Sequence, residues 1–141
     1  MKKIFLIFSA EDAQKVKNST PFLSSPEYDL DLYEGSLDMD FDARAAEVIK
    51  REMGEKIVQC GIALCLIGEN TYNSKWVDLQ LQKSRNKGNR IIAMALKGIK
   101  NAVLPGVITE ENLTFYPWDP QRLKKLIAEE TDSRYNNKKR S

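Results

Sequence analysis

The 141-residue sequence contains no histidine and only two cysteines, Cys60 and Cys65. The lack of histidine excludes a Ser-His-Asp triad, and with only two thiols left it argues against a zinc site. Two cysteines are also too few for a disulfide framework, and Cys65 falls inside a predicted strand. We therefore expect reduced, buried thiols and a cytoplasmic location.

Long apolar runs and phosphate-binding loops are missing as well. No run approaches the ~20 apolar residues of a membrane helix, and a first strand from Lys3 or Ile4 leaves no room for a signal peptide. No G-x-G-x-x-G or Walker sequence follows a predicted strand. Asp38, Asp40 and Asp42 alternate without the glycine and closing glutamate of a calcium loop, so we expect no metal. The net charge of +2 indicates neither a nucleic-acid nor a membrane partner.

The stretch from Ile62 to Leu96 organises the chain. Two continuous apolar runs, Ile62–Ile67 and Ile91–Leu96, predict strands Ile62–Ile67 and Arg90–Leu96. They flank a helix that Asn73 or Ser74 can cap and that Gly88 can end. Two strands buried on both faces and joined by one helix form a right-handed parallel unit. Because ligands of such sheets bind outside the carboxyl ends of the strands, we expect the site near the loop between the first run and the helix.

Further elements complete an α/β order. The expected elements are buried strand Lys3–Phe8, short helix Ala13–Lys17, edge strand Tyr28–Tyr33, amphipathic helix Ala43–Gln59 capped by Asp42, last strand Leu113–Tyr116, and a helix starting at Asp119-Pro120. We predict one α/β domain over residues 1–130, built on a parallel sheet of four or five strands. A disordered basic tail is expected over residues 131–141.

The predicted helix after Ser74 presents two faces. Trp76 and Gln80 are four residues apart and share one face, whereas Val77, Leu81 and Ser84 share the face better placed against the sheet. Trp76 and Gln80 can therefore line a cleft while the other face packs. The alternatives are a Trp76 that plugs the core and a Gln80 that is solvated. A core plug predicts a loss of about 3–5 kcal/mol in Trp76→Ala, whereas a cleft wall predicts weaker ligand binding.

Two segments resemble TIR domains. KIFLIFSAED, starting at Lys3, is similar to their first box, a strand that ends in aromatic-Ser followed by acidic residues. IALCLIGENTYNSKWVDLQLQKS, starting at Ile62, is similar to their later strand, loop, Ser-x-Trp and helix. The marks L-I-G-x-x-T, S-K-W-V and K-S-x-x-K-G-N-R-I-I resemble most the bacterial TIR-like branch of Thoeris antiphage defence. The resemblance covers about residues 2–96 and implies a flavodoxin-like, three-layer fold.

The resemblance also implies an activity. Enzymatic members cleave the nicotinamide–ribose bond of NAD and release a cyclic or conjugated ADP-ribose signal, which activates a separate effector protein. NAD, or a related nucleotide, would thus be a substrate rather than a cofactor, and self-association is a further expectation. The implied substrate-binding residues are Phe8 and Ser9 beside the nicotinamide ribose, Glu34, Gly35, Leu37 and Asp38 in a loop over the nucleotide, and Trp76 as a wall.

The sequence departs from the family at position 80. The family places a glutamate four residues after the tryptophan, where it contacts the ribose hydroxyls and helps the sugar pass through an oxocarbenium-like state. Gln80 can hydrogen-bond a ribose but has no negative charge. Two explanations are open: a natural Gln80 in a weakened or non-catalytic interaction module, or an engineered Glu→Gln change that holds substrate without turnover.

Overall fold

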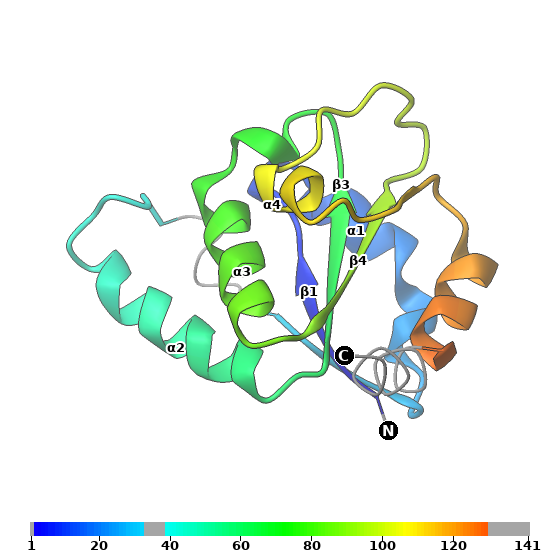
Figure 1. Ribbon diagram of the computed structural model, residues 1–141, viewed down its shortest axis with the longest axis horizontal. Coiled ribbons are helices and arrows are strands. Elements are labelled where there is room, and N and C mark those ends of the chain that lie inside the picture. Colours follow the sequence, from blue (N-terminus) through cyan, green and yellow to red (C-terminus); the bar gives the residue numbers. More distant parts are fainter. Residues whose placement is uncertain (1, 33–38, 130–141) are drawn as a thin grey trace.

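The computed structural model describes residues 2–32 and 39–129 and shows a five-stranded sheet with helices on both faces (Figure 1). The strands lie in the order β2-β1-β3-β4-β5, and every neighbouring pair is parallel. Their bounds are β1 Lys2–Ile7, β2 Tyr28–Asp31, β3 Ile62–Ile67, β4 Arg90–Ala95 and β5 Phe115–Tyr116. The predicted α/β fold with a parallel sheet is confirmed, and the sheet has the larger of the two expected strand numbers.

The central strand β3 is buried along its whole length, which explains its uninterrupted apolar sequence. Successive side chains of a strand point to opposite faces, so the sheet divides the interior into two cores. One core, here called the α1-side core, contains Ile4, Leu6 and Leu64. The other, the α3-side core, contains Phe5, Ile7 and Cys65.

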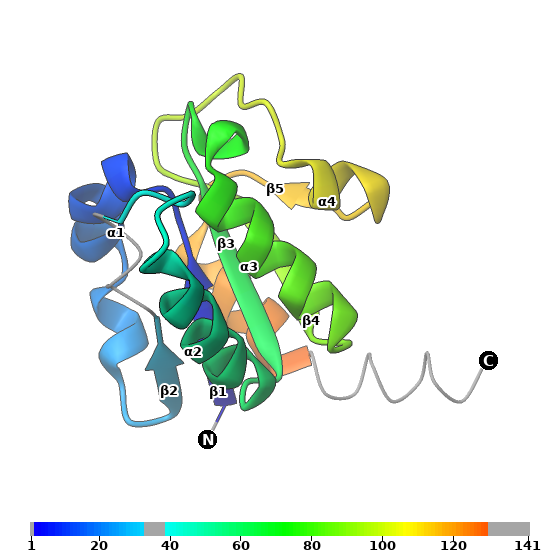
Figure 2. The same ribbon diagram turned by 90° about the vertical axis from the view of Figure 1, so that its left-hand side faces the viewer.

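Helices cover the two cores to make three layers (Figure 2). The α1-side core is closed by Val16 of α1 (Ala13–Ser19), by the 3-10 turn Pro21–Ser24, and by the helix over residues 120–129. The α3-side core is closed by α2 (Ala46–Val58), α3 (Lys75–Asn86) and α4 (Gly106–Glu110). Among the described residues, no helix combines the length and apolar character needed to cross a membrane.

Helix α3 begins and ends where the sequence predicts. The Ser74 hydroxyl oxygen accepts a hydrogen bond from the Val77 N–H at 3.2 Å, which satisfies one free donor of the first turn. Gly88 follows the helix with φ 78, a left-handed conformation that glycine adopts without strain. The cap sets the helix start at the carboxyl edge of the sheet, directly after the 3-10 turn Thr71–Asn73.

The predicted cap of α2 is wrong. The helix begins at Ala46, later than expected, and no side chain caps it. Asp42 instead forms an ion pair with Lys75 at 3.0 Å, and its N–H donates to Asp40 Oδ1 at 3.1 Å. The charge on α3 and the Asp40 side chain therefore hold Asp42 in a turn before the helix. The expected end of β2 at Tyr33 and the expected tail from Thr131 lie outside the described residues.

Candidate functional site

The carboxyl ends of β1 and β3 form the point at which the strand order changes direction. From β1 the chain proceeds to β2 on one side, whereas β3 lies on the other side. Ligands of open parallel sheets bind in the crevice at such a point. The segments that follow the two strands are Ser9–Asp12 and Gly68–Thr71, and α3 starts beside them at the same edge (Figure 2).

Phe8 and Ser9 leave β1 towards different layers. Phe8 packs against the α1-side core. Ser9 is 8% exposed and lies two residues beyond the end of β1; because its backbone is still extended, continued alternation directs its side chain to the side of Phe5 and Ile7. The Phe8 ring thus belongs to the α1-side core, whereas the backbone direction at Ser9 favours the side of the sheet that carries α3.

Gln80 is buried at 5% exposure, although it belongs to the face expected to line a cleft. Val77, Leu81 and Ser84 are completely buried, as the helix pattern predicts. The Ser84 hydroxyl donates to the Gln80 backbone carbonyl at 2.8 Å. The Gln80 side-chain amide makes no hydrogen bond with another described residue. Gln80 as a whole is therefore buried rather than solvated, while the tip of its amide, which has no hydrogen-bond partner in the described part of the chain, still reaches the surface.

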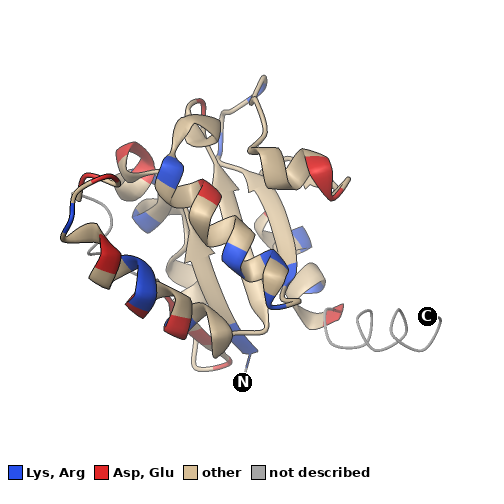
Figure 3. Cartoon of the chain, turned by 60° about the vertical axis from the view of Figure 1, so that its left-hand side comes forward, with Lys and Arg blue, Asp and Glu red and all other residues tan. Residues whose placement is uncertain are grey.

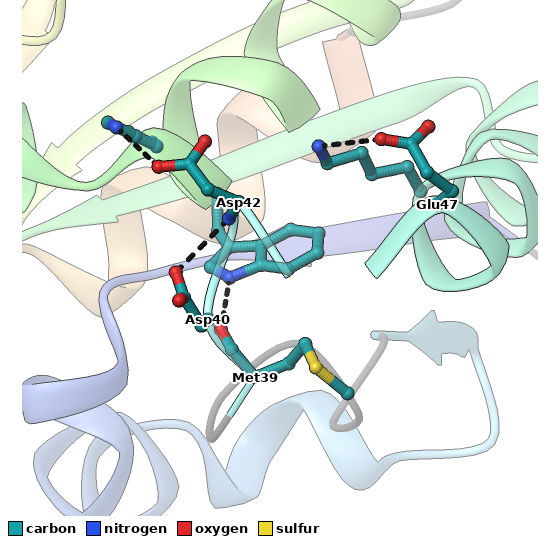
Figure 4. A network of polar contacts seen from close by, with 7 residues as sticks. Met39, Asp40, Asp42 and Glu47 are labelled. Atoms are coloured by element: carbon teal, nitrogen blue, oxygen red, sulfur yellow. Dashed lines mark hydrogen bonds and ion pairs between the residues drawn. The ribbon is translucent and has the colours of Figure 1, made fainter. Parts of the chain in front are cut away.

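Trp76 is half-buried and ties α3 to the turn that precedes α2. Its indole N–H donates to the Met39 carbonyl at 2.8 Å (Figure 4). The Phe41 ring meets the indole edge to face, with centroids 5.1 Å apart. The rest of the indole packs against the α3-side core. Trp76 is thus neither a fully buried plug nor a free wall, because its single donor is already used.

Cations surround this aromatic pair. The Lys50 ammonium lies 3.9 Å from the centroid of the Phe41 ring, and the Lys75 ammonium lies 5.9 Å from it. Lys50 also pairs with Glu47 at 3.4 Å, and Figure 4 shows this pair beside the contacts of Asp42. Exposed ion pairs contribute little singly, but together these contacts fix the turn at residues 39–42 on the start of α3.

Asp12 is a residue that the sequence analysis did not single out. Its Oδ2 atom is buried and has no hydrogen-bond partner among the described residues. Burial, followed by the charge of Glu11, raises the pKa of the Asp12 carboxyl, while Lys15 acts in the opposite direction. The sequence signals were its place just after β1, at the edge where ligands bind, and its position among the acidic residues of the first TIR-like box.

Gly68 explains how Asp12 fits. A side-chain Cβ at Gly68 would lie 2.8 Å from Asp12 Cγ, closer than real Cβ atoms approach, so the carboxyl occupies the space that glycine leaves. The Thr71 hydroxyl oxygen accepts from the Gly68 N–H at 2.7 Å and fixes the turn below. The ends of β1 and β3 therefore fit together through Asp12 and Gly68.

Two expectations, the nucleotide-binding loop and the lack of a metal site, are addressed only within the described residues. Glu34, Gly35, Leu37 and Asp38 lie outside the described residues, so their place relative to Trp76 and Gln80 stays a prediction. Within residues 2–32 and 39–129, no three side chains of metal-binding type are grouped so that they could hold an ion.

The sheet order, the α3 cap and the Trp76–Gln80 edge define a TIR-like α/β domain. The crystal structure of the TIR domain of the Toll-related receptor TRR-2 from Hydra magnipapillata superimposes with a TM-score of 0.56 at 15% identity, covering 88% of this chain and 90% of that one. The chain belongs to the family of the Thoeris protein ThsB, TIR-like domain, whose model matches residues 5–101.

A second similar structure comes from an enzyme. The Clostridium botulinum CMP N-glycosidase BcmB superimposes with a TM-score of 0.55 at 17% identity, covering 89% of this chain and 98% of that one. At such identity the likeness shows a shared fold. No curated protein sequence matches the chain significantly.

Proposed function

We propose that this protein is a TIR-type enzyme that cleaves the nicotinamide–ribose bond of NAD, or of a related nucleotide. The product would be a cyclic or conjugated ADP-ribose signal in antiphage defence, read by a separate effector protein. Membership of the Thoeris TIR-like family supports this proposal. The glycosidase neighbour adds that the fold accommodates cleavage of a bond between a base and a ribose.

The observation that carries the proposal is the position of residue 80. It lies one turn after Trp76 on α3, buried, with a side-chain amide that no described residue uses. An amide that reaches the surface and has no hydrogen-bond partner in the described part of the chain is available to a ligand hydroxyl. In this role Gln80 would contact the ribose, Ser9 would border it, and Trp76 would hold the turn at residues 39–42 beside it.

The chemistry explains why this chain would be slow. Loss of nicotinamide leaves positive charge on the ribose, so a carboxylate helps the transition state more than the ground state. The Gln80 amide provides a dipole of similar shape but no charge. We therefore expect binding with little turnover, and we expect Glu34, Gly35, Leu37 and Asp38 to contribute nucleotide contacts.

The test is nicotinamide release at saturating NAD by the chain and by Gln80→Glu. The substitution should raise the rate by roughly 10²–10³, the effect of one preorganised electrostatic group, while changing the dissociation constant far less. Gln121→Glu adds the same charge at an exposed position and should leave the rate unchanged. Cytosine release from CMP, measured in parallel, tests the related-nucleotide alternative.

A second candidate is a non-catalytic interaction module, and the uncharged Gln80 is the observation that favours it. Such a module predicts no release of nicotinamide or cytosine by either form, even when the signal that activates the system is supplied. That result would overturn the enzymatic proposal.

A further inference from the structure

Within the described residues, one cation between α2 and α3 has no carboxylate partner. The end of the Lys83 side chain lies over Gly54 of α2, since a Cβ there would be 3.4 Å from Lys83 Nζ and 3.6 Å from Cε. No ion pair of Lys83 is formed within the described part of the chain. The other partly buried cations of these two helices each have one: Lys50 with Glu47 (3.4 Å), Lys56 with Asp31 (3.2 Å) and Arg85 with Glu110 (2.8 Å).

Lys83 lies on the same stripe of α3 as Trp76 and Gln80. Residues three and four apart on a helix have Cβ atoms about 5–6 Å from each other, so positions 80 and 83 are neighbours. Side chains of a helix also lean towards its N-terminus, which inclines Lys83 towards position 80. Gly54, which has no side chain, leaves the space on α2 over which the lysine extends.

Burial makes a charge at position 80 expensive unless a partner is present. Gln80 is 5% exposed, and a carboxylate at such a place favours its neutral form unless an opposite charge lies nearby. The remaining basic residues of α3 are directed elsewhere, with Lys75 paired to Asp42 and Arg85 paired to α4. Lys83 is therefore the cation of α3 that is both close and uncommitted within the described residues.

We infer that Lys83 is the charge partner of position 80, a positioning residue that keeps a carboxylate at that position ionised and oriented. The inference rests on the proposed function, in which active forms of this site carry a carboxylate there. In the present chain Gln80 is neutral, so the lysine has no carboxylate partner among residues 2–32 and 39–129. Lys83 itself would act only through residue 80 and need not touch the nucleotide.

A double-mutant cycle tests the inference without any substrate. The variants are Gln80→Glu, Lys83→Met and the two combined, and the readout is the NMR titration of the introduced carboxyl. With Lys83 present, we expect the introduced carboxyl at position 80 to be ionised at neutral pH. Lys83→Met should raise its pKa by at least one unit, a tenfold change in proton affinity. Lys87→Met is the matched control, because it removes an exposed cation from the same side of α3 and should leave the titration unchanged.

The same carboxyl pKa with and without Lys83 would overturn the inference, whether or not NAD is cleaved. If the variants with a carboxylate at position 80 do not fold, the stability of Lys83→Met in the chain that keeps Gln80 still tests the inference. Uncompensated charge predicts an unchanged or larger folding equilibrium constant at pH 7. A tenfold smaller constant would show that the lysine has another partner, and would contradict its assignment to position 80.

Discussion

Trp76 is the residue whose role the structure changes most. Its indole N–H donates to the Met39 carbonyl, and its ring meets Phe41, so both its polar and its aromatic contacts are made within the protein. A ligand at this edge could touch the exposed part of the ring but could not use the donor. Trp76 therefore affects the site mainly through the turn at residues 39–42.

The residue-scale prediction separates the hydrogen bond from the ring. Trp76→Phe keeps an aromatic side chain but removes the N–H, and should lower the free energy of unfolding by about 0.5–1.5 kcal/mol, the usual net value of a hydrogen bond. Trp76→Ala should cost more, because it also removes the packing against Phe41. Urea denaturation followed by circular dichroism measures both.

Trp118→Phe serves as the control, since Trp118 packs on the α1-side core and lies far from this turn in sequence. If Trp76→Phe were as stable as the parent chain and bound NAD less tightly, the indole would be a ligand contact rather than a loop anchor.

At the scale of elements, the contact between α2 and α3 combines local weakness with a functional arrangement. Gly54 lies in the interior of α2, where glycine has a poor helix propensity, yet the Lys83 side chain lies over it. The nearest atom of Lys83 to a Cβ at this position is 3.4 Å away, which is ordinary van der Waals contact. The space around position 54 is therefore large enough for a side chain with a Cβ.

We accordingly expect Gly54→Ala to stabilise the protein. The gain should be about 0.5–1 kcal/mol, the difference in helix propensity between the two residues. Thermal and urea unfolding measure it directly. Gly68→Ala is the contrasting variant and should destabilise, because its Cβ would meet the Asp12 carboxyl. A loss of stability in Gly54→Ala would contradict this expectation and show that the contact with Lys83 outweighs the gain in helix propensity.

At the scale of the whole molecule, the two thiols report on opening of the sheet. Both cysteines are free and buried. Burial raises the pKa of Cys60 to about 11 and that of Cys65 to about 12, with a smaller contribution from Asp31 at Cys60. Since the thiolate is the reactive form, both should be inert in the folded protein near pH 8.

Cys65 lies on the central strand β3, whereas Cys60 precedes it and is 6% exposed. We expect a thiol reagent to modify Cys65 at the rate set by global unfolding, and Cys60 faster, through local opening. The reaction of Cys60→Ser with a chromogenic disulfide, followed across a urea series, isolates Cys65. Rapid modification of Cys65 without urea would contradict the burial of β3.

The sequence by itself determined the parts that depend on neighbours along the chain. Continuous apolar runs identified β3 and β4, because strands covered on both faces have no polar side. Ser74 and Gly88 identified the limits of α3 through capping chemistry that acts within a few residues. Order along the chain was enough for a parallel α/β sheet, and the motifs around Trp76 were enough for the family.

Only the tertiary structure decided which distant residues meet. Local rules predict that Asp42 caps a helix, but in the structure it forms an ion pair with Lys75 instead. Gln80 would be solvated on an isolated helix, but α3 packs with it buried. Asp12 and Gly68 are far apart in sequence, and their fit exists because β1 and β3 are adjacent. These contacts depend on the packing of the layers, which no local pattern encodes, and they are the contacts from which the candidate site is built.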